Sequence, residues 1–154
     1  MTSNEQINVI KRNGRGKESL NIDKIHSMVG FATEGITGVS ASHVEMNSGL
    51  HFFDGISTDD IQQILIKSAN DLISLDNPNY QFVAARLLLF SLRKNLFHRL
   101  WEHPKFIDHI KKLIDLGLYD KGILENYTKA EIDRMGMWID HERDYSFTYA
   151  GLRQ

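Results

Sequence analysis

Hydrophobic residues recur every three to four positions through most of the first hundred residues, as the apolar face of a helix requires. This spacing runs through residues 22–32, returns after Ser57, and becomes densest after Pro78. Each run follows a residue suited to begin a helix, either a side-chain cap or a first-turn proline. The pattern therefore predicts four helices, which begin near Asn21, Ser40, Ser57 or Thr58, and Pro78.

The fourth predicted helix, which ends near Phe97, is apolar on nearly all of its faces. Such a helix is usually buried at the centre of its domain. Ahead of the first helix, a short β-like run at residues 7–10 is followed by Asn13 and Gly14, a pair that favours a hairpin turn. The predicted fold class is therefore mainly α (α+β), with a four-helix unit capped by a small N-terminal β-hairpin or sheet.

The pattern changes after Phe97. Residues 101–104 are typical of a connection, and residues 106–116 have the spacing of another amphipathic helix that ends at Gly117. Asp120 and Thr128 are suited to cap two further short helices. We therefore expect a first domain at residues 5–97 and the helical beginning of a second domain at residues 98–154.

Composition narrows the possible functions. Eighteen basic and twenty acidic side chains give a formal net charge of -2, whereas proteins that bind nucleic-acid backbones usually carry a basic excess. The chain has no cysteine, which excludes disulfides, thiolate metal sites and thiol chemistry. Neither a secretory signal nor an apolar run long enough to span a bilayer is visible. We expect a cytoplasmic protein with neither nucleic acid nor membrane as a partner.

No established catalytic motif is present: the chain lacks a P-loop, a nucleophile elbow and a zinc-binding His-Glu-x-x-His pair. Residues 141–144, His-Glu-Arg-Asp, place possible metal ligands next to one another in sequence. Adjacent residues of a helix do not share a face, however, so a polar connection is the favoured interpretation. The sequence predicts no catalytic and no metal-binding residues.

Several polar residues have two interpretations. Lys94, near the end of the fourth predicted helix, either complements the helix dipole or joins Lys11 in binding a triphosphate. Thr58 either caps its helix or belongs to a helix start that binds phosphate or ribose oxygens. Glu18 and Asn21 are either solvated turn residues or contacts to a base or sugar.

A succession of motifs identifies a family. These motifs are Ile22-Asp23-Lys24-Ile25-His26, Asp54-Gly55-Ile56, Asp71-Leu72-Ile73-Ser74, Ala84-Ala85-Arg86-Leu87, Leu92-Arg93-Lys94 and Ile139-Asp140-His141-Glu142-Arg143-Asp144. Through them the chain resembles the N-terminal region of the large (alpha) subunit of bacterial-type and phage-type class I ribonucleotide reductase, which begins with an ATP-cone.

The resemblance implies a regulatory function. In that family, the ATP-cone binds ATP or dATP, with Mg²⁺, as an allosteric effector of overall activity. ATP keeps the enzyme active, and dATP promotes an inhibited oligomer. The implied partners are the remainder of the large subunit and the small, radical-generating subunit, and Asp60 is implied as a supporting residue. The implied nucleotide-binding residues are Lys11, Arg12, Glu18, Asn21, Lys24, Ile25, Phe52, Thr58, Ile61, Gln62 and Lys94.

The sequence departs from the family in ways that leave alternatives open. Gln62 stands where many relatives have a histidine that contacts the nucleotide, and Phe31 replaces a tryptophan. An alternative is a nucleotide-free docking fragment of a split large subunit. A cone-bearing transcription repressor is disfavoured, because it would need a cysteine-rich zinc ribbon. Since the chain has no cysteine, it cannot reduce a ribonucleotide by itself, and we expect a truncated, fragmentary or split form of the subunit.

Overall fold

The computed structural model describes residues 7–11, 16–98 and 103–154. The chain forms two compact units: the first comprises the residues up to Ser91 together with Tyr145–Gln154, and the second comprises Leu92–Asp144. The change from one unit to the other falls inside a single long helix. The predicted division at residues 97 and 98 therefore stays a prediction, and each unit is described by itself.

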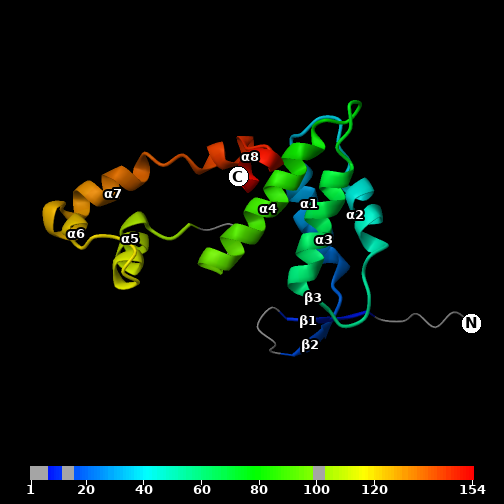
Figure 1. Ribbon diagram of the computed structural model, residues 1–154, viewed down its shortest axis with the longest axis horizontal. Helices are drawn as coiled ribbons and strands as arrows, with labels where there is room; N and C mark the ends of the chain where they lie inside the picture. The colour runs from blue at the N-terminus through cyan, green and yellow to red at the C-terminus, as the bar shows by residue number, and fades with distance from the viewer. Residues whose placement is uncertain (1–6, 12–15, 99–102) are drawn as a thin grey trace, which may run out of the picture. The chain divides into compact units, whose positions relative to one another are not determined.

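The first unit contains the predicted helices: α1 (Ile22–Thr33), α2 (Ala41–Gly49), α3 (Thr58–Asp71) and the first part of α4 (Tyr80–Phe97). Contacts join α1 to α2 and α2 to α3, and these helices lie side by side in Figure 1. The mainly helical fold class with a small N-terminal sheet is thus confirmed.

Helix starts follow the side chains available to cap them. The backbone N–H of Lys24 donates to Asn21 Oδ1 at 3.0 Å, as predicted for α1. Ser57 rather than Thr58 caps α3, since its Oγ accepts from the backbone N–H of Asp60 at 3.0 Å. Ser40 precedes α2 without a side-chain cap; its backbone N–H donates instead to the hydroxyl of Tyr80 at 3.0 Å.

The core of the first unit is centred on α4, as the apolar pattern of this helix predicts. Its residues Val83, Ala84 and Leu87 have no exposed surface, and Phe90 is 1% exposed. The other helices contribute residues that are equally buried: Val29 and Ala32 of α1, Val44 of α2, and Leu65 and Ala69 of α3.

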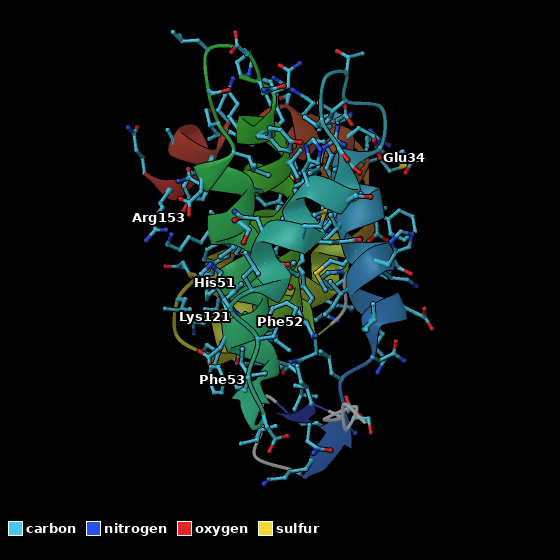
Figure 2. The ribbon with its side chains drawn as sticks, turned by 90° about the vertical axis from the view of Figure 1, so that its right-hand side faces the viewer. Glu34, His51, Phe52, Phe53, Lys121 and Arg153 are labelled. Atoms are coloured by element: carbon cyan, nitrogen blue, oxygen red, sulfur yellow. The ribbon has the colours of Figure 1, made fainter. Side chains whose placement is uncertain are left out.

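A small sheet lies at the end of the bundle where α1 and α3 begin (Figure 1). Its order is β2 (Lys17–Ser19), β1 (Asn8–Ile10), β3 (Ile56–Ser57). The predicted antiparallel pair β1–β2 is present, and the turn residues 12–15 lie outside the described residues. The third strand, β3, runs parallel to β1 and follows a connection that contains His51, Phe52 and Phe53 (Figure 2).

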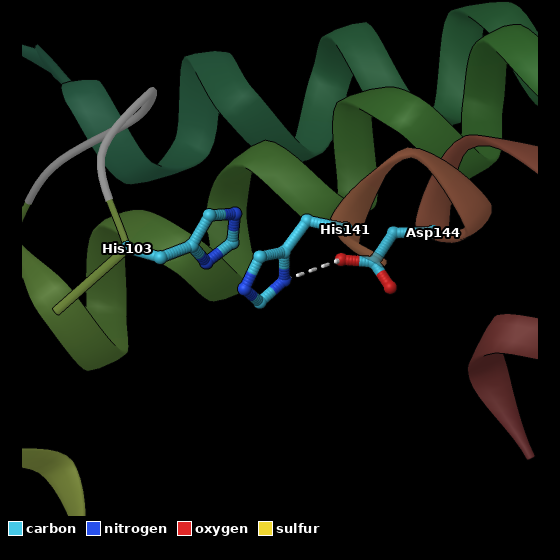
Figure 3. Close-up of side chains that lie close together, drawn as sticks. All are labelled: His103, His141 and Asp144. Atoms are coloured by element: carbon cyan, nitrogen blue, oxygen red, sulfur yellow. Dashed lines mark ion pairs between the residues drawn. The ribbon is translucent and has the colours of Figure 1, made fainter. Parts of the chain in front are cut away.

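The second unit contains α5 (Phe106–Asp115), α6 (Gly122–Asn126) and α7 (Lys129–Met137) around a small core. A capping box begins α7, because Thr128 and Glu131 each accept from the other's backbone N–H. The 3₁₀ helix η1 (His141–Ser146) follows (Figure 3), and α8 (Tyr149–Arg153) groups with the first unit. The core consists of Ile107, Ile110 and Ile132, with Phe106, Ile114, Ile123 and Leu124 packed against it.

Among the helices that the structure describes, none has both the length and the apolar character needed to cross a membrane.

Candidate functional site

The sheet brings the end of β1 to the beginning of α3. The parallel register pairs Val9 with Ile56 and Ile10 with Ser57, the cap of α3. Lys11 follows Ile10, and Thr58 follows Ser57, so Lys11 lies next to the first turn of α3. A cation beside a helix N-terminus is an arrangement suited to an anion, since the helix dipole and its unpaired N–H groups also favour negative charge.

Glu18 lies at the centre of a cluster of charges beside this point. Its Oε2 is 3.0 Å from Lys11 Nζ, and its Oε1 is 3.8 Å from Lys24 Nζ. The side chain of Glu18 is 35% exposed, whereas those of Lys11 and Lys24 are 50% and 70% exposed. Ion pairs this exposed contribute little to stability, so an incoming phosphate can replace the carboxylate as the partner of either lysine.

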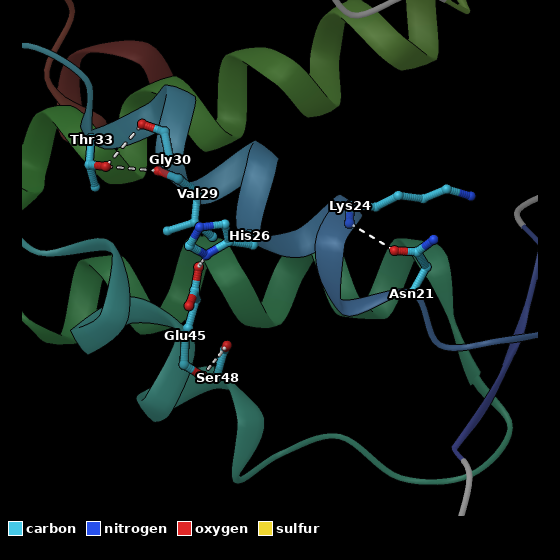
Figure 4. A network of polar contacts seen from close by, with 8 residues as sticks. All are labelled: Asn21, Lys24, His26, Val29, Gly30, Thr33, Glu45 and Ser48. Atoms are coloured by element: carbon cyan, nitrogen blue, oxygen red, sulfur yellow. Dashed lines mark hydrogen bonds and ion pairs between the residues drawn. The ribbon is translucent and has the colours of Figure 1, made fainter.

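Asn21 joins the same cluster through the first turn of α1 (Figure 4). Its Oδ1 accepts from the backbone N–H of Lys24, which fixes both residues relative to each other. Because the cap uses this oxygen, a contact between Asn21 and a ligand would fall to the Nδ2 hydrogens. Ile25, one turn into α1, is 8% exposed and lies mainly in the core.

The first turns of α3 carry three predicted residues in different surroundings. Thr58 is half-buried at the helix start, and Ile61 is 7% exposed. Gln62 is 5% exposed, and its Nε2 donates to the backbone oxygen of Leu87 at 2.9 Å. The amide of Gln62 therefore joins α3 to α4, a contact that no local sequence pattern predicts.

Three further residues were predicted to bind the nucleotide: Phe52, Lys94 and Arg12. Phe52 is half-buried in the connection between α2 and β3 (Figure 2). Lys94 is half-buried in the last turn of α4, a turn that belongs to the second unit. Arg12 lies outside the described residues. The structure thus brings together Lys11, Glu18, Asn21, Lys24 and the start of α3.

Sequence reasoning missed one polar pair that holds this arrangement. The carboxylate of Asp54 accepts from the backbone N–H of Asn8 at 2.8 Å and from its Nδ2 at 3.0 Å. These bonds, the backbone one first, hold the pKa of Asp54 below its usual value. Gly55, with φ 82°, then turns the chain so that its N–H donates to the Asn8 carbonyl. The Asp-Gly dipeptide was the available signal for this turn.

A family model and the curated relatives agree on the family of this chain. A family model described as "ATP cone domain" matches residues 7–95. The chain is 46% identical over 151 residues to ribonucleoside-diphosphate reductase 1 subunit alpha of Escherichia coli K12, which covers 98% of this chain and 20% of that protein. It is 47% identical over 146 residues to the reductase subunit alpha of Buchnera aphidicola from Acyrthosiphon pisum, and that match covers 95% of this chain and 19% of that protein. It is 43% identical over 148 residues to that of Enterobacteria phage T4, covering 96% and 19%.

These matches confirm the resemblance inferred from the sequence motifs. The chain spans about a fifth of the length of the relatives it matches. The matched description names ATP, a phosphate-bearing nucleotide, and the structure places the cation of Lys11 beside the start of α3.

Proposed function

The chain belongs to the ATP-cone family, and on that premise we propose that residues 7–95 bind ATP or dATP and so regulate a ribonucleoside-diphosphate reductase. The chain would supply the allosteric domain of the large subunit and none of its redox chemistry. The observation that carries this proposal is the parallel register of β1 and β3, which sets Lys11 beside the start of α3.

The phosphates are the best supported part of the ligand. Lys11 and Lys24 share one carboxylate between them, so two lysine cations are held near each other, and Lys11 is the one beside the start of α3. We assign the triphosphate to these lysines, and the resemblance to the family implies Arg12 and Lys94 as further phosphate-binding residues. Asp59 and Asp60 stand in the first turn of α3, where they would repel bare phosphate. A bound Mg²⁺ would remove that repulsion, since carboxylates and phosphate oxygens are the ligands that it prefers.

The same cluster also offers contacts for the nucleoside. When phosphate takes Lys11, the Glu18 carboxylate loses its 3.0 Å partner and becomes an acceptor for ribose hydroxyls. Asn21 supplies amide hydrogens from the adjoining helix start. We assign the apolar contacts to the base to Ile25, Ile61 and Phe52, and a polar contact to Gln62.

Regulation requires that ATP and dATP favour different states of the protein. The two differ by one hydroxyl, and a single hydrogen bond contributes about 0.5–1.5 kcal/mol net. One contact therefore discriminates by about tenfold or less. We propose that the difference is summed over several subunits, through an assembly with the rest of the large subunit and the small subunit, in which dATP favours the inhibited form.

Two contacts favour a second candidate, a docking fragment that binds no nucleotide. The Gln62 amide donates to Leu87, and Lys11 is paired with Glu18, so both groups already have protein partners. A docking fragment would keep both contacts permanently. An effector site would exchange at least the exposed Lys11–Glu18 ion pair for a contact between Lys11 and phosphate.

Calorimetric titration of the full chain with ATP and dATP in Mg²⁺ separates the two candidates. We expect saturable binding that weakens by about ten- to a hundredfold in Lys11→Ala, because a hydrogen bond to a charged group is lost. Lys67→Ala is the matched control, since Lys67 is an exposed lysine paired with Asp71 at the other end of α3. A folded chain that binds neither nucleotide would support the docking fragment. Light scattering in the presence of the rest of the large subunit then tests whether dATP alone enlarges the assembly.

A further inference from the structure

Three side chains of metal-ligand type meet in the second unit (Figure 3). One ligand atom from each of His103, His141 and Asp144 lies within 4.8 Å of the other two. All three residues are partly buried. His103 comes from the connection that precedes α5, and the other two come from η1, beyond α7. The folded chain therefore brings together ligands that are far apart in sequence.

The geometry of η1 explains how His141 and Asp144 come to share a face. A 3₁₀ helix has three residues per turn, so side chains at positions i and i+3 lie one above the other. His141 Nδ1 is 3.8 Å from Asp144 Oδ2 as a result. Adjacent residues such as His141 and Glu142 do face apart, but residues at positions i and i+3 of this helix do not.

We propose that His103, His141 and Asp144 form a binding site for a divalent transition-metal ion of the zinc type. Two imidazoles and one carboxylate are a donor set found in sites for zinc and for cobalt, nickel and iron. Calcium and magnesium are disfavoured, because they prefer oxygen ligands. A site with three protein ligands leaves room for water or for a ligand from elsewhere.

A pocket of about 550 Å³ adjoins the cluster and gives an ion access to it. His103 and His141 are both part of its lining, together with Phe97, Tyr119 and Met137. The open coordination positions would face this pocket, so a small anion or a side chain of a partner could complete the coordination. The pocket lies wholly within the second unit.

Binding requires one movement. The two imidazole rings are stacked, with centroids 3.5 Å apart and planes at 4°. An imidazole nitrogen presents its lone pair in the ring plane, so two parallel rings cannot both point at one ion. His103 lies outside any helix, and the ring torsion of histidine has a broad profile, so this ring can turn at small cost. Metal binding would therefore separate the stacked rings.

Arg93 limits the affinity of the site. Its side chain is 6% exposed, and its guanidinium is 2.9 Å from Asp144 Oδ2. This contact orients the carboxylate, as the outer partners of metal ligands commonly do. The positive charge also opposes a cation, so we expect a dissociation constant on the order of micromolar, weaker than that of a structural zinc site with four ligands.

An ion bound here would have a structural consequence. It would join the connection ahead of α5 to the helix that follows α7, the two ends of the second unit's small core. An ion that binds only the folded form raises the apparent stability of that form. The site would therefore stabilise the second unit independently of any nucleotide bound by the first.

Titration of the chelator-treated full chain with Co²⁺ tests the proposal, followed by displacement with Zn²⁺. We expect one ion per chain, a cobalt absorption band in the visible region, and a higher melting temperature with Zn²⁺. His103→Gln and His141→Gln should each weaken binding by about tenfold or more, since each removes a ligand. Far-UV circular dichroism establishes that both variants are folded. Asp144→Asn is avoided as the primary test, because it would leave the nearly buried Arg93 without its carboxylate.

His26→Gln is the matched control. His26 Nδ1 lies 2.9 Å from Glu45 Oε1, so it offers one imidazole and one carboxylate without a second histidine in that group (Figure 4). Its loss should leave cobalt binding unchanged. Absence of saturable binding would overturn the proposal. Binding that survives in both His103→Gln and His141→Gln would also overturn it, and so would binding that falls equally in His26→Gln. Either result would mean that cobalt binds to scattered surface imidazoles.

Discussion

The carboxylate of Asp54 accepts two hydrogen bonds from one residue, Asn8: one from its backbone N–H at 2.8 Å and one from its side-chain amide at 3.0 Å. Asn8 begins β1, and Asp54 stands two residues ahead of β3. The pair therefore fixes the relative position of the two parallel strands. Since these strands set Lys11 beside the start of α3, the geometry of the proposed phosphate site depends on a contact that touches no ligand.

The first prediction concerns the stability of the chain at acid pH. The pKa of Asp54 is lowered from 3.8, chiefly by the Asn8 backbone bond. A carboxyl whose pKa is depressed by folding contributes stability above its unfolded pKa, and that contribution is lost as pH falls through the folded pKa. Asp54→Ala should therefore lower the free energy of unfolding at neutral pH. The difference from the unsubstituted chain should shrink below about pH 3.8, as measured by urea denaturation across a pH series. A difference that is constant with pH would contradict the assignment.

The second prediction concerns Glu18 as the internal partner of Lys11. Glu18→Gln removes the carboxylate that phosphate must displace, so inorganic tripolyphosphate should bind up to about fivefold more tightly, the equivalent of one exposed ion pair. ATP should gain less, because the same change replaces the charged acceptor proposed for the ribose with a weaker, neutral amide oxygen. Isothermal calorimetry with both ligands measures this. Glu34→Gln, an exposed acid at the other end of α1, is the control. Equal tripolyphosphate affinities in Glu18→Gln and the unsubstituted chain would show that Glu18 does not compete.

The third prediction separates the two roles of Gln62. Gln62→Met removes the donor to Leu87 but keeps a flexible side chain of similar length in a buried position. The lost hydrogen bond and the gained apolar burial should nearly cancel, with a net change in unfolding free energy within about 1 kcal/mol. Affinity for ATP should fall by about tenfold if the amide also contacts the nucleotide. An unchanged affinity would make Gln62 a residue of the helix interface alone.

The fourth prediction concerns the contact between α5 and α7. A Cβ added at Gly136 would lie 2.7 Å from Phe106 Cβ, which is too close for two carbon atoms. Gly136→Ala should therefore destabilise the second unit by about 1–3 kcal/mol. Gly30→Ala is the matched control: it is also helical, nothing lies within 4 Å of its added Cβ, and the change should stabilise by about 0.5–1 kcal/mol. Guanidinium denaturation of both variants checks the opposite signs.

Much of the fold could be predicted because it depends on residues close in sequence. Asn21 and Ser57 cap helices whose first N–H groups lie three residues away. The apolar pattern of α4 gives its burial directly, since a helix that is apolar on most faces has no polar side to present to water. The family was also evident from motifs, each of which is a short run of residues.

Other features were decided only by the tertiary structure, because they join segments whose approach depends on the path of the chain between them. The strand β3 has two residues, too few for a pattern, and exists because β1 lies alongside it. The Gln62 bond to Leu87 requires the packing of α3 against α4. His103 meets His141 and Asp144 only after α5, α6 and α7 have folded between them. The sequence by itself determined helices α1 to α4, the caps of α1 and α3, and the family, since those follow from local chemistry. The tertiary structure decided which polar groups meet, since that depends on distances which no local pattern encodes.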